Sequence, residues 1–175
     1  MNSGLSVSRV GGDAQTKAMK AVVKSLKSDL AQYRELAAFA QFGSDLDKAT
    51  QAQLRRGERV VEVMKQPQYQ PLPLVKEVVI IFAVTNGYLD DVPAGKVRDF
   101  ERDLFRFMDS QHKPLADSIA TAKKLDEATE KQVRAMLGEF KKTNSYAPAE
   151  KAPARTDVAS GQGASPSAAA RDTQK

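Results

Sequence analysis

The stretch QTKAMKAVVKSLKSDLAQYRELAAFA, residues 15–40, decides the fold class. Its apolar residues recur at intervals of three and four positions: Met19, Val22, Val23, Leu26, Leu30, Tyr33, Leu36, Phe39 and Ala40. This spacing keeps an apolar stripe on one face of an α-helix, whereas a half-buried strand would alternate apolar and polar residues. The stretch therefore predicts a long amphipathic helix that buries its stripe against neighbouring elements.

The same period continues downstream. Gly43 is expected to end the first helix, with a cap at Ser44 or Asp45 for the next. That second helix is predicted over residues 47–65. Its inward residues are predicted to be Leu54, Val60, Val61 and Met64. Gly57 in its interior costs about 1 kcal/mol relative to alanine, so a neighbouring element is expected to approach closely there.

A proline-rich segment, residues 66–73, interrupts the helical pattern. Pro67, Pro71 and Pro73 prevent a regular helix from crossing it. Residues 74–84 then form the most apolar stretch, and its β-branched content would also suit a buried strand. Because no partner strand is visible elsewhere, this stretch is predicted to be a buried helix that ends at the pair Asn86-Gly87.

Further helices are predicted to open at Pro93 and at Pro114, and a last one to span residues 126–142. The fold class is therefore all-α, a bundle of five to six helices over residues 15–142. Residues 1–14 are expected to form an extended N-terminal arm. Residues 143–175 are expected to form a disordered tail, because 17 of the last 29 residues are Ala, Pro, Ser or Gly and none is Leu, Ile, Phe or Met.

Composition excludes several classes of site. The 175 residues contain no cysteine and one histidine, His112, which excludes thiolate metal sites, disulfides and sites that need two imidazoles. The net charge of +5 is modest for a nucleic-acid-binding protein, so no nucleic-acid partner is expected. No apolar run approaches the roughly 18 residues of a spanning helix, and the N-terminus lacks a signal-peptide pattern. A soluble intracellular protein without membrane insertion is expected.

Three features imitate catalytic motifs. The pair Gly95-Lys96 lacks the first glycine and the final hydroxyl residue of a phosphate-binding loop, and it follows no strand. The pairs Asp45/Asp47 and Asp90/Asp91 suggest a metal site or acid–base chemistry, but helix capping is the better interpretation. His112 is interpreted as a partner for the C-terminal dipole of a helix. No metal site is expected.

Several stretches taken together carry a family resemblance. They are GLSVSRVGG at residues 4–12, LAQYRELAAFAQFGSDLD at residues 30–47, MKQPQY at residues 64–69 and NGYLDD at residues 86–91. In order and spacing, the sequence resembles the C-terminal part of the alpha subunit of F-type ATP synthase from about residue 4 to residue 142. The resemblance implies an all-helical C-terminal domain, in agreement with the periodicity.

The resemblance also implies roles for individual residues. Arg9, within SVSRVGG, matches the arginine finger that the family supplies to the neighbouring catalytic site on the beta subunit, and Ser6 matches a loop serine needed for activity. Gln66 and Gln68 match residues that contact the adenine of a bound, non-catalytic nucleotide. The turn at residues 43–47 matches the region that faces the rotor. By composition alone, the stretch around Arg9 would be interpreted as a frayed N-terminal arm.

The implied partners are ATP synthase beta subunits, the gamma rotor stalk and the other alpha-subunit domains, in a peripheral complex on the cytoplasmic face of the membrane. ATP or ADP with Mg²⁺ is the expected cofactor of the full complex, which couples ATP synthesis or hydrolysis to proton movement. The family's β-barrel and phosphate-binding loop are not in this sequence, so the chain alone is expected to bind no nucleotide. A fragment, a truncated reading frame or a genuine short protein all fit, and the alternative function is a non-catalytic helical interaction or assembly module.

Overall fold

In the computed structural model the described residues are 9–24, 26–40 and 46–146, and side-chain description excludes Arg9 and Phe39. All regular structure in these ranges is helical. The elements are α1 (Arg9–Ala14), α2 (Lys17–Val23), α3 (Leu26–Ala40), α4 (Lys48–Met64), α5 (Leu74–Thr85), the 3-10 turn η1 (Ala94–Lys96), α6 (Val97–Gln111), α7 (Lys113–Ala122) and α8 (Glu127–Thr143). The predicted all-α fold class is confirmed.

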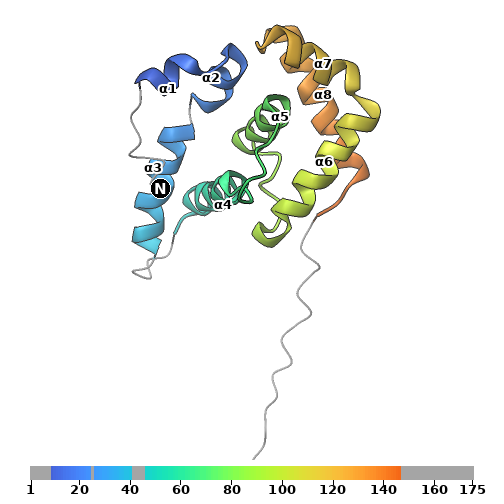
Figure 1. The fold of residues 1–175 in the computed structure, drawn as a ribbon. Coiled ribbons are helices and arrows are strands. Elements are labelled where there is room, and N and C mark those ends of the chain that lie inside the picture. The colour runs from blue at the N-terminus through green and yellow to red at the C-terminus, as the bar shows by residue number, and fades with distance from the viewer. Residues whose placement is uncertain (1–8, 25, 41–45, 147–175) are drawn as a thin grey trace, which may run out of the picture.

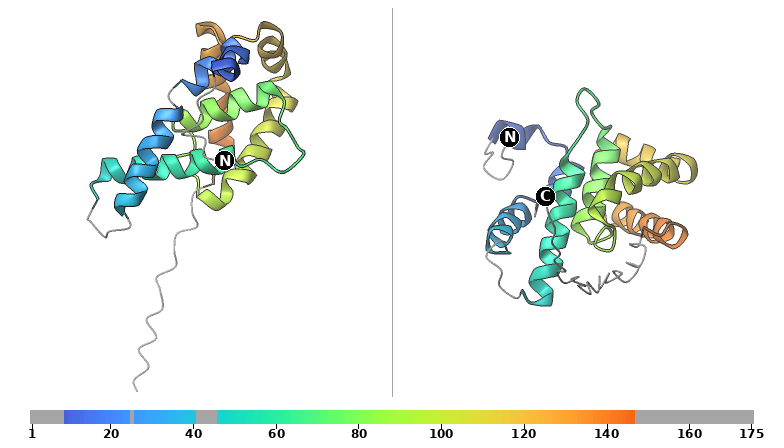
Figure 2. Two further views of the ribbon diagram at one scale, coloured as in Figure 1. Left: turned by 60° about the vertical axis from the view of Figure 1, so that its left-hand side comes forward. Right: turned by 90° about the horizontal axis from the view of Figure 1, so that it is seen from below.

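Helix α5 lies at the centre of the bundle (Figure 1). It packs against α2 and α4 on one side and against α7 on the other. Helices α6, α7 and α8 pack on one another, and α3 packs on the outer side of α4 (Figures 1 and 2). The core therefore surrounds one central helix.

The sequence of α5 suits this central place. Seven consecutive residues, Val78–Val84, are buried, so the helix has no solvent-facing stripe over two turns. Its end is a Schellman motif, because the Tyr88 N–H donates to the Ala83 carbonyl at 3.0 Å and the Gly87 N–H donates to the Val84 carbonyl at 3.2 Å. Gly87 has φ +80°, a conformation that glycine adopts without steric cost. The prediction of a buried helix ending at Asn86-Gly87 is confirmed.

The N-terminal region contains more and shorter helices than its periodicity predicts. The long helix expected from residue 15 is two helices, α2 and α3, which pack on each other. The apolar spacing continues through the break because both helices bury apolar residues there, α2 against α5 and α3 against α4, and Val22 and Leu26 are each 6% exposed. Residues 9–14, expected in an extended arm, form the short helix α1, while residues 1–8 lie outside the described residues.

Helices α3 and α4 approach closely at Gly57, as the sequence predicts. A methyl group at Gly57 would overlap the Cβ, Cγ and Cδ2 atoms of Tyr33. Helix α4 begins at an N-cap, since the Asp47 carboxylate accepts the Thr50 N–H at 3.4 Å. One inward prediction is wrong: Met64, at the last turn of α4, is 43% exposed, and Val63 is buried in its place.

Aromatic rings join α6, α8 and the residues that follow α8. The Phe100 and Phe140 rings meet edge to face with centroids 5.2 Å apart, and Tyr146 lies 5.4 Å from Phe100. The Tyr146 hydroxyl donates to the Asp103 carboxylate at 2.9 Å. Burial, together with this carboxylate, raises the pKa of the Tyr146 hydroxyl well above its ordinary value. Tyr146 thus packs on the bundle, although the sequence predicts a disordered tail from residue 143, and residues 147–175 lie outside the described residues.

The capping interpretation of Asp90 and Asp91 is wrong. The Asp90 carboxylate accepts two hydrogen bonds from the Arg56 guanidinium on α4. The Asp91 carboxylate lies 2.6 Å from the Lys141 ammonium on α8. Both aspartates lie in the turn after α5, where cations 34 and 50 residues away in sequence reach them. Asp45 lies outside the described residues.

Candidate functional site

The four predicted site residues are described by the structure to different extents. Ser6 lies outside the described residues, and so do residues 43–45 of the turn expected to face the rotor. Arg9 is described by its backbone alone, as the first residue of α1. Gln66 and Gln68 are fully described and exposed. The candidate site is therefore built on the loop that carries these two glutamines, residues 65–73 between α4 and α5.

This α4–α5 loop projects away from the helices, most clearly in the right-hand view of Figure 2. Its tip is a four-residue turn closed by the Gln70 N–H, which donates to the Pro67 carbonyl at 3.3 Å. Pro71 and Pro73 restrict the backbone on the return to α5, and Pro73 stands immediately before the first residue of that helix. The loop therefore projects with a restricted backbone and holds its side chains outside the core.

The two glutamines have different surroundings. The Gln66 amide nitrogen donates to the Glu77 carboxylate on α5 at 3.3 Å, which fixes the base of the loop. The Gln68 side chain makes no hydrogen bond to another described residue that would compete with a ligand. A primary amide carries one acceptor and two donors, so an exposed Gln68 can donate to and accept from one planar partner. The two glutamines are therefore binding groups, because a neutral amide is neither a general base nor a nucleophile.

An apolar groove of about 330 Å³ lies beside this loop. Its walls come from α2, α3, α4 and α5, and Gln15, Gln66 and Glu77 are the polar residues that line it. Gln15 directly follows α1, so the groove brings the end of the N-terminal segment close to Gln66. The structure thus joins the region after Arg9 to the loop with the glutamines, although 57 positions of sequence separate Arg9 from Gln66.

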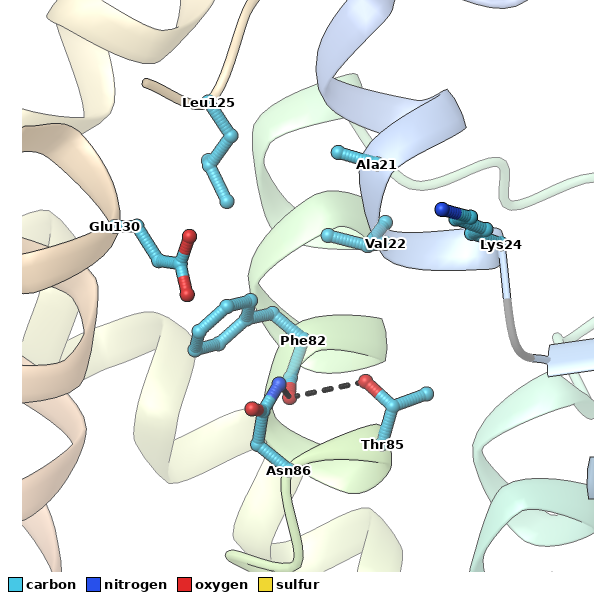
Figure 3. Close-up of a pocket in the computed structure, with 8 residues that line it drawn as sticks. All are labelled: Ala21, Val22, Lys24, Phe82, Thr85, Asn86, Leu125 and Glu130. Carbon is cyan, nitrogen blue, oxygen red and sulfur yellow. Dashed lines mark hydrogen bonds between the residues drawn. The ribbon is translucent and has the colours of Figure 1, made fainter. Parts of the chain in front are cut away.

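A second cleft, of about 490 Å³, opens between α2, the end of α5 and the start of α8 (Figure 3). Phe82 forms its floor, and Lys24 and Glu130 lie on opposite sides. Its neutral polar groups are already used: the Thr85 hydroxyl donates to carbonyls of α5, and the Asn86 amide donates to the Phe82 carbonyl at 2.9 Å. These bonds complete the end of α5, so the cleft presents no converging catalytic groups.

Two of the residues singled out in these motifs, Lys96 and His112, lie next to helix ends. Lys96 ends the η1 turn and its ammonium lies 3.0 Å from Asp99, so it serves the start of α6 and no phosphate loop. His112 stands at the junction of α6 and α7, with Nε2 at 3.4 Å from the Glu139 carboxylate and no hydrogen bond. Within residues 9–24, 26–40 and 46–146, no three His, Asp or Glu side chains gather as a metal site would require, and no helix is long and apolar enough to cross a membrane.

Sequence reasoning missed two residues, Arg59 on α4 and Tyr69 in the loop. Arg59 is 8% exposed, and its guanidinium donates to the Val92 carbonyl at 2.9 Å and the Arg55 carbonyl at 2.9 Å. Tyr69, at the tip of the loop, has φ +61° and is 91% exposed. An arginine in a helix and a tyrosine among glutamines give no sequence signal for either state, because both depend on residues distant in the sequence or on the backbone of the turn.

Comparisons with known proteins agree with the architecture. The family model for the ATP synthase alpha/beta chain, C terminal domain, matches residues 15–140. The sequence is 59% identical over 143 residues to a protein described as ATP synthase subunit alpha from Syntrophomonas wolfei subsp. wolfei (strain DSM 2245B / Goettingen). That match covers 82% of this protein and 28% of the relative, so the protein spans little more than a quarter of the length of this relative.

Proposed function

The protein belongs to the family of C-terminal domains of ATP synthase alpha and beta subunits, and we propose that it acts as the C-terminal domain of an alpha subunit in a proton-translocating F-type complex. Its proposed partners are beta subunits, the gamma rotor stalk and the nucleotide-binding domain of the alpha subunit. The complex would lie on the cytoplasmic face of the membrane as a peripheral assembly and couple ATP synthesis or hydrolysis to proton movement.

The observation that carries this proposal is the α4–α5 loop. Gln66 and Gln68 lie on this projecting loop outside the core, where a nucleotide held by another domain can reach them. Their amides would contact the edge of the adenine base, since an amide can both donate to and accept from that edge. Mg²⁺ and the phosphates would be held elsewhere, because phosphate binding in such enzymes depends on backbone amides and a lysine of a phosphate loop.

Arg9 and Ser6 carry the catalytic part of the proposal. Arg9 would supply a guanidinium to the γ-phosphate at the neighbouring beta site, and Ser6 would hold the segment that presents it. Helix α1 begins at Arg9 and ends before the groove, so this segment enters the bundle beside the proposed nucleotide loop. The arginine would stabilise charge that develops in the transition state, where its planar fork can donate to two oxygens.

The test uses a full-length alpha subunit that has this sequence as its C-terminal region, assembled with beta and gamma. Arg9→Ala should lower steady-state turnover by roughly 10³-fold or more while catalytic-site nucleotide affinity stays nearly constant. Arg9→Lys should restore only part of the rate, because lysine keeps the charge and loses the fork.

Arg106→Ala is the matched control, since Arg106 is an exposed arginine on α6 far in sequence from the site. Both variants should assemble normally. Unchanged turnover in Arg9→Ala would remove Arg9 from the mechanism, and failed assembly of Arg9→Ala alone would assign it a structural role.

A further inference from the structure

Tyr69 has an unusual backbone conformation. Among the described non-glycine residues, positive φ values occur at Tyr69 (φ +61°) and Lys123 (φ +51°). Lys123 is the C-cap of α7, a position where helices commonly end in the left-handed region. Tyr69 is in the α4–α5 loop, away from any helix end, and an aromatic residue in this region is a genuine outlier. Such an outlier is grounds for a functional hypothesis.

A tyrosine is unusual at this position of the turn. In a four-residue turn closed from Gln70 to Pro67, a positive φ at the third residue is a position that glycine or asparagine ordinarily fills. The sequence has a tyrosine there, and the residue is 91% exposed. No hydrogen bond or ring contact joins this ring to another described residue, so packing within the described domain does not explain it.

The neighbours of Tyr69 indicate the kind of partner that its ring fits. Gln68 precedes it and Gln70 follows it, and both are exposed. An aromatic side chain that inserts into an apolar protein pocket would be expected among apolar neighbours, whereas a ring between amides suits a ligand with a flat face and a hydrogen-bonding edge. A purine base is such a ligand, since aromatic side chains stack on its face and amides address its edge.

We propose that Tyr69 is the stacking residue of the nucleotide site, and that its ring packs on the face of the adenine whose edge is contacted by Gln66 and Gln68. This inference rests on the proposed function. Amide contacts to a base edge distinguish one base from another only when the plane of the base is fixed, and stacking on the ring fixes that plane. The left-handed turn, held between prolines, aims the ring outward before the nucleotide arrives and so lowers the ordering cost of binding.

The experiment measures binding of Mg-ATP and of Mg-tripolyphosphate, which has no base, to the full-length alpha subunit by calorimetry. Tyr69→Asn keeps a residue that tolerates positive φ and removes the ring, whereas Tyr69→Phe keeps the ring. Tyr69→Asn should weaken Mg-ATP binding roughly five-fold or more, the range for loss of one base–aromatic stack, and leave tripolyphosphate binding unchanged. Tyr69→Phe should bind both ligands like the wild type, as should the control Arg106→Ala on the exposed surface of α6.

The outcomes separate this inference from the function on which it rests. Wild-type Mg-ATP affinity in Tyr69→Asn, together with weakened binding in Gln68→Ala, would overturn the stacking role and keep the nucleotide loop. No effect in either variant would overturn both. Equal weakening of Mg-ATP and tripolyphosphate in Tyr69→Asn would show a loss of structure that reaches the separate phosphate site, and would also overturn the stacking role.

Discussion

Gly57→Ala tests how closely α3 and α4 approach. Alanine in the interior of α4 gains about 1 kcal/mol of helix propensity over glycine. The new methyl group would overlap Tyr33 at Cβ and Cγ, the atoms nearest its backbone, so a rotamer change cannot relieve the overlap. Helix α3 must move instead, and overpacking of this kind costs about 1–3 kcal/mol. We expect the upper end of that range and a net destabilisation of about 2 kcal/mol.

The assay is thermal and urea unfolding of the 175-residue protein. At about 4 °C per kcal/mol for a domain of this size, Tm should fall by roughly 8 °C. Gly138→Ala in α8 is the matched control, because a methyl group there meets no atom within 4 Å. It should gain about 1 kcal/mol from helix propensity alone.

A second background checks the cause. In a Tyr33→Gly variant the space beside Gly57 is open, so adding Gly57→Ala should become stabilising, and the two substitutions should be strongly coupled. If Gly57→Ala stabilises the wild-type protein as much as Gly138→Ala does, the close approach of α3 and α4 is wrong.

Two further predictions concern polar groups in the fold. Arg59→Ala should destabilise the protein by about 1–3 kcal/mol, because it leaves the covered Val92 carbonyl without its donor, and an unchanged urea midpoint would contradict this. Tyr146 has a raised pKa in the folded state, so its neutral hydroxyl stabilises the fold below the ordinary tyrosine pKa of about 10, and this contribution is lost as pH rises beyond that value. Free energies of unfolding measured at about pH 9 and pH 11 should therefore differ less in Tyr146→Phe than in the wild type, and equal differences would refute the role of the hydroxyl.

Sequence periodicity predicted the features that depend on local pattern. The apolar stretch of α5 was ambiguous between strand and helix by composition, and the absence of a partner strand decided it correctly. The ends of helices followed glycine and carboxylate signals, as at Gly87 and at Asp126, whose carboxylate accepts the Thr129 N–H at 3.0 Å. These signals act within a few residues, so one sequence is enough to identify them.

Features that depend on distant residues were missed. Asp90 and Asp91 have the composition of caps, yet their partners Arg56 and Lys141 come from helices that only folding brings near. The break between α2 and α3 leaves the three–four spacing intact, so the hydrophobic pattern gives no sign of it. In the candidate site, the family resemblance supplied Gln66 and Gln68, whereas the left-handed backbone of Tyr69 follows from a turn geometry that tyrosine does not signal.

The adjacent carboxylates after α5 also bear on the mechanics of the domain. Asp90 links the turn to α4, and Asp91 links it to α8. A displacement of α4 relative to α8 must therefore lengthen one of these ion pairs or change the backbone conformation at the two aspartates. Asp91 and Lys141 lie partly in solvent, where dissolved salt screens their attraction, while the apolar contacts around α5 are insensitive to it. Raising the ionic strength should therefore weaken the link from this turn to α8 and leave the apolar packing around α5 unchanged.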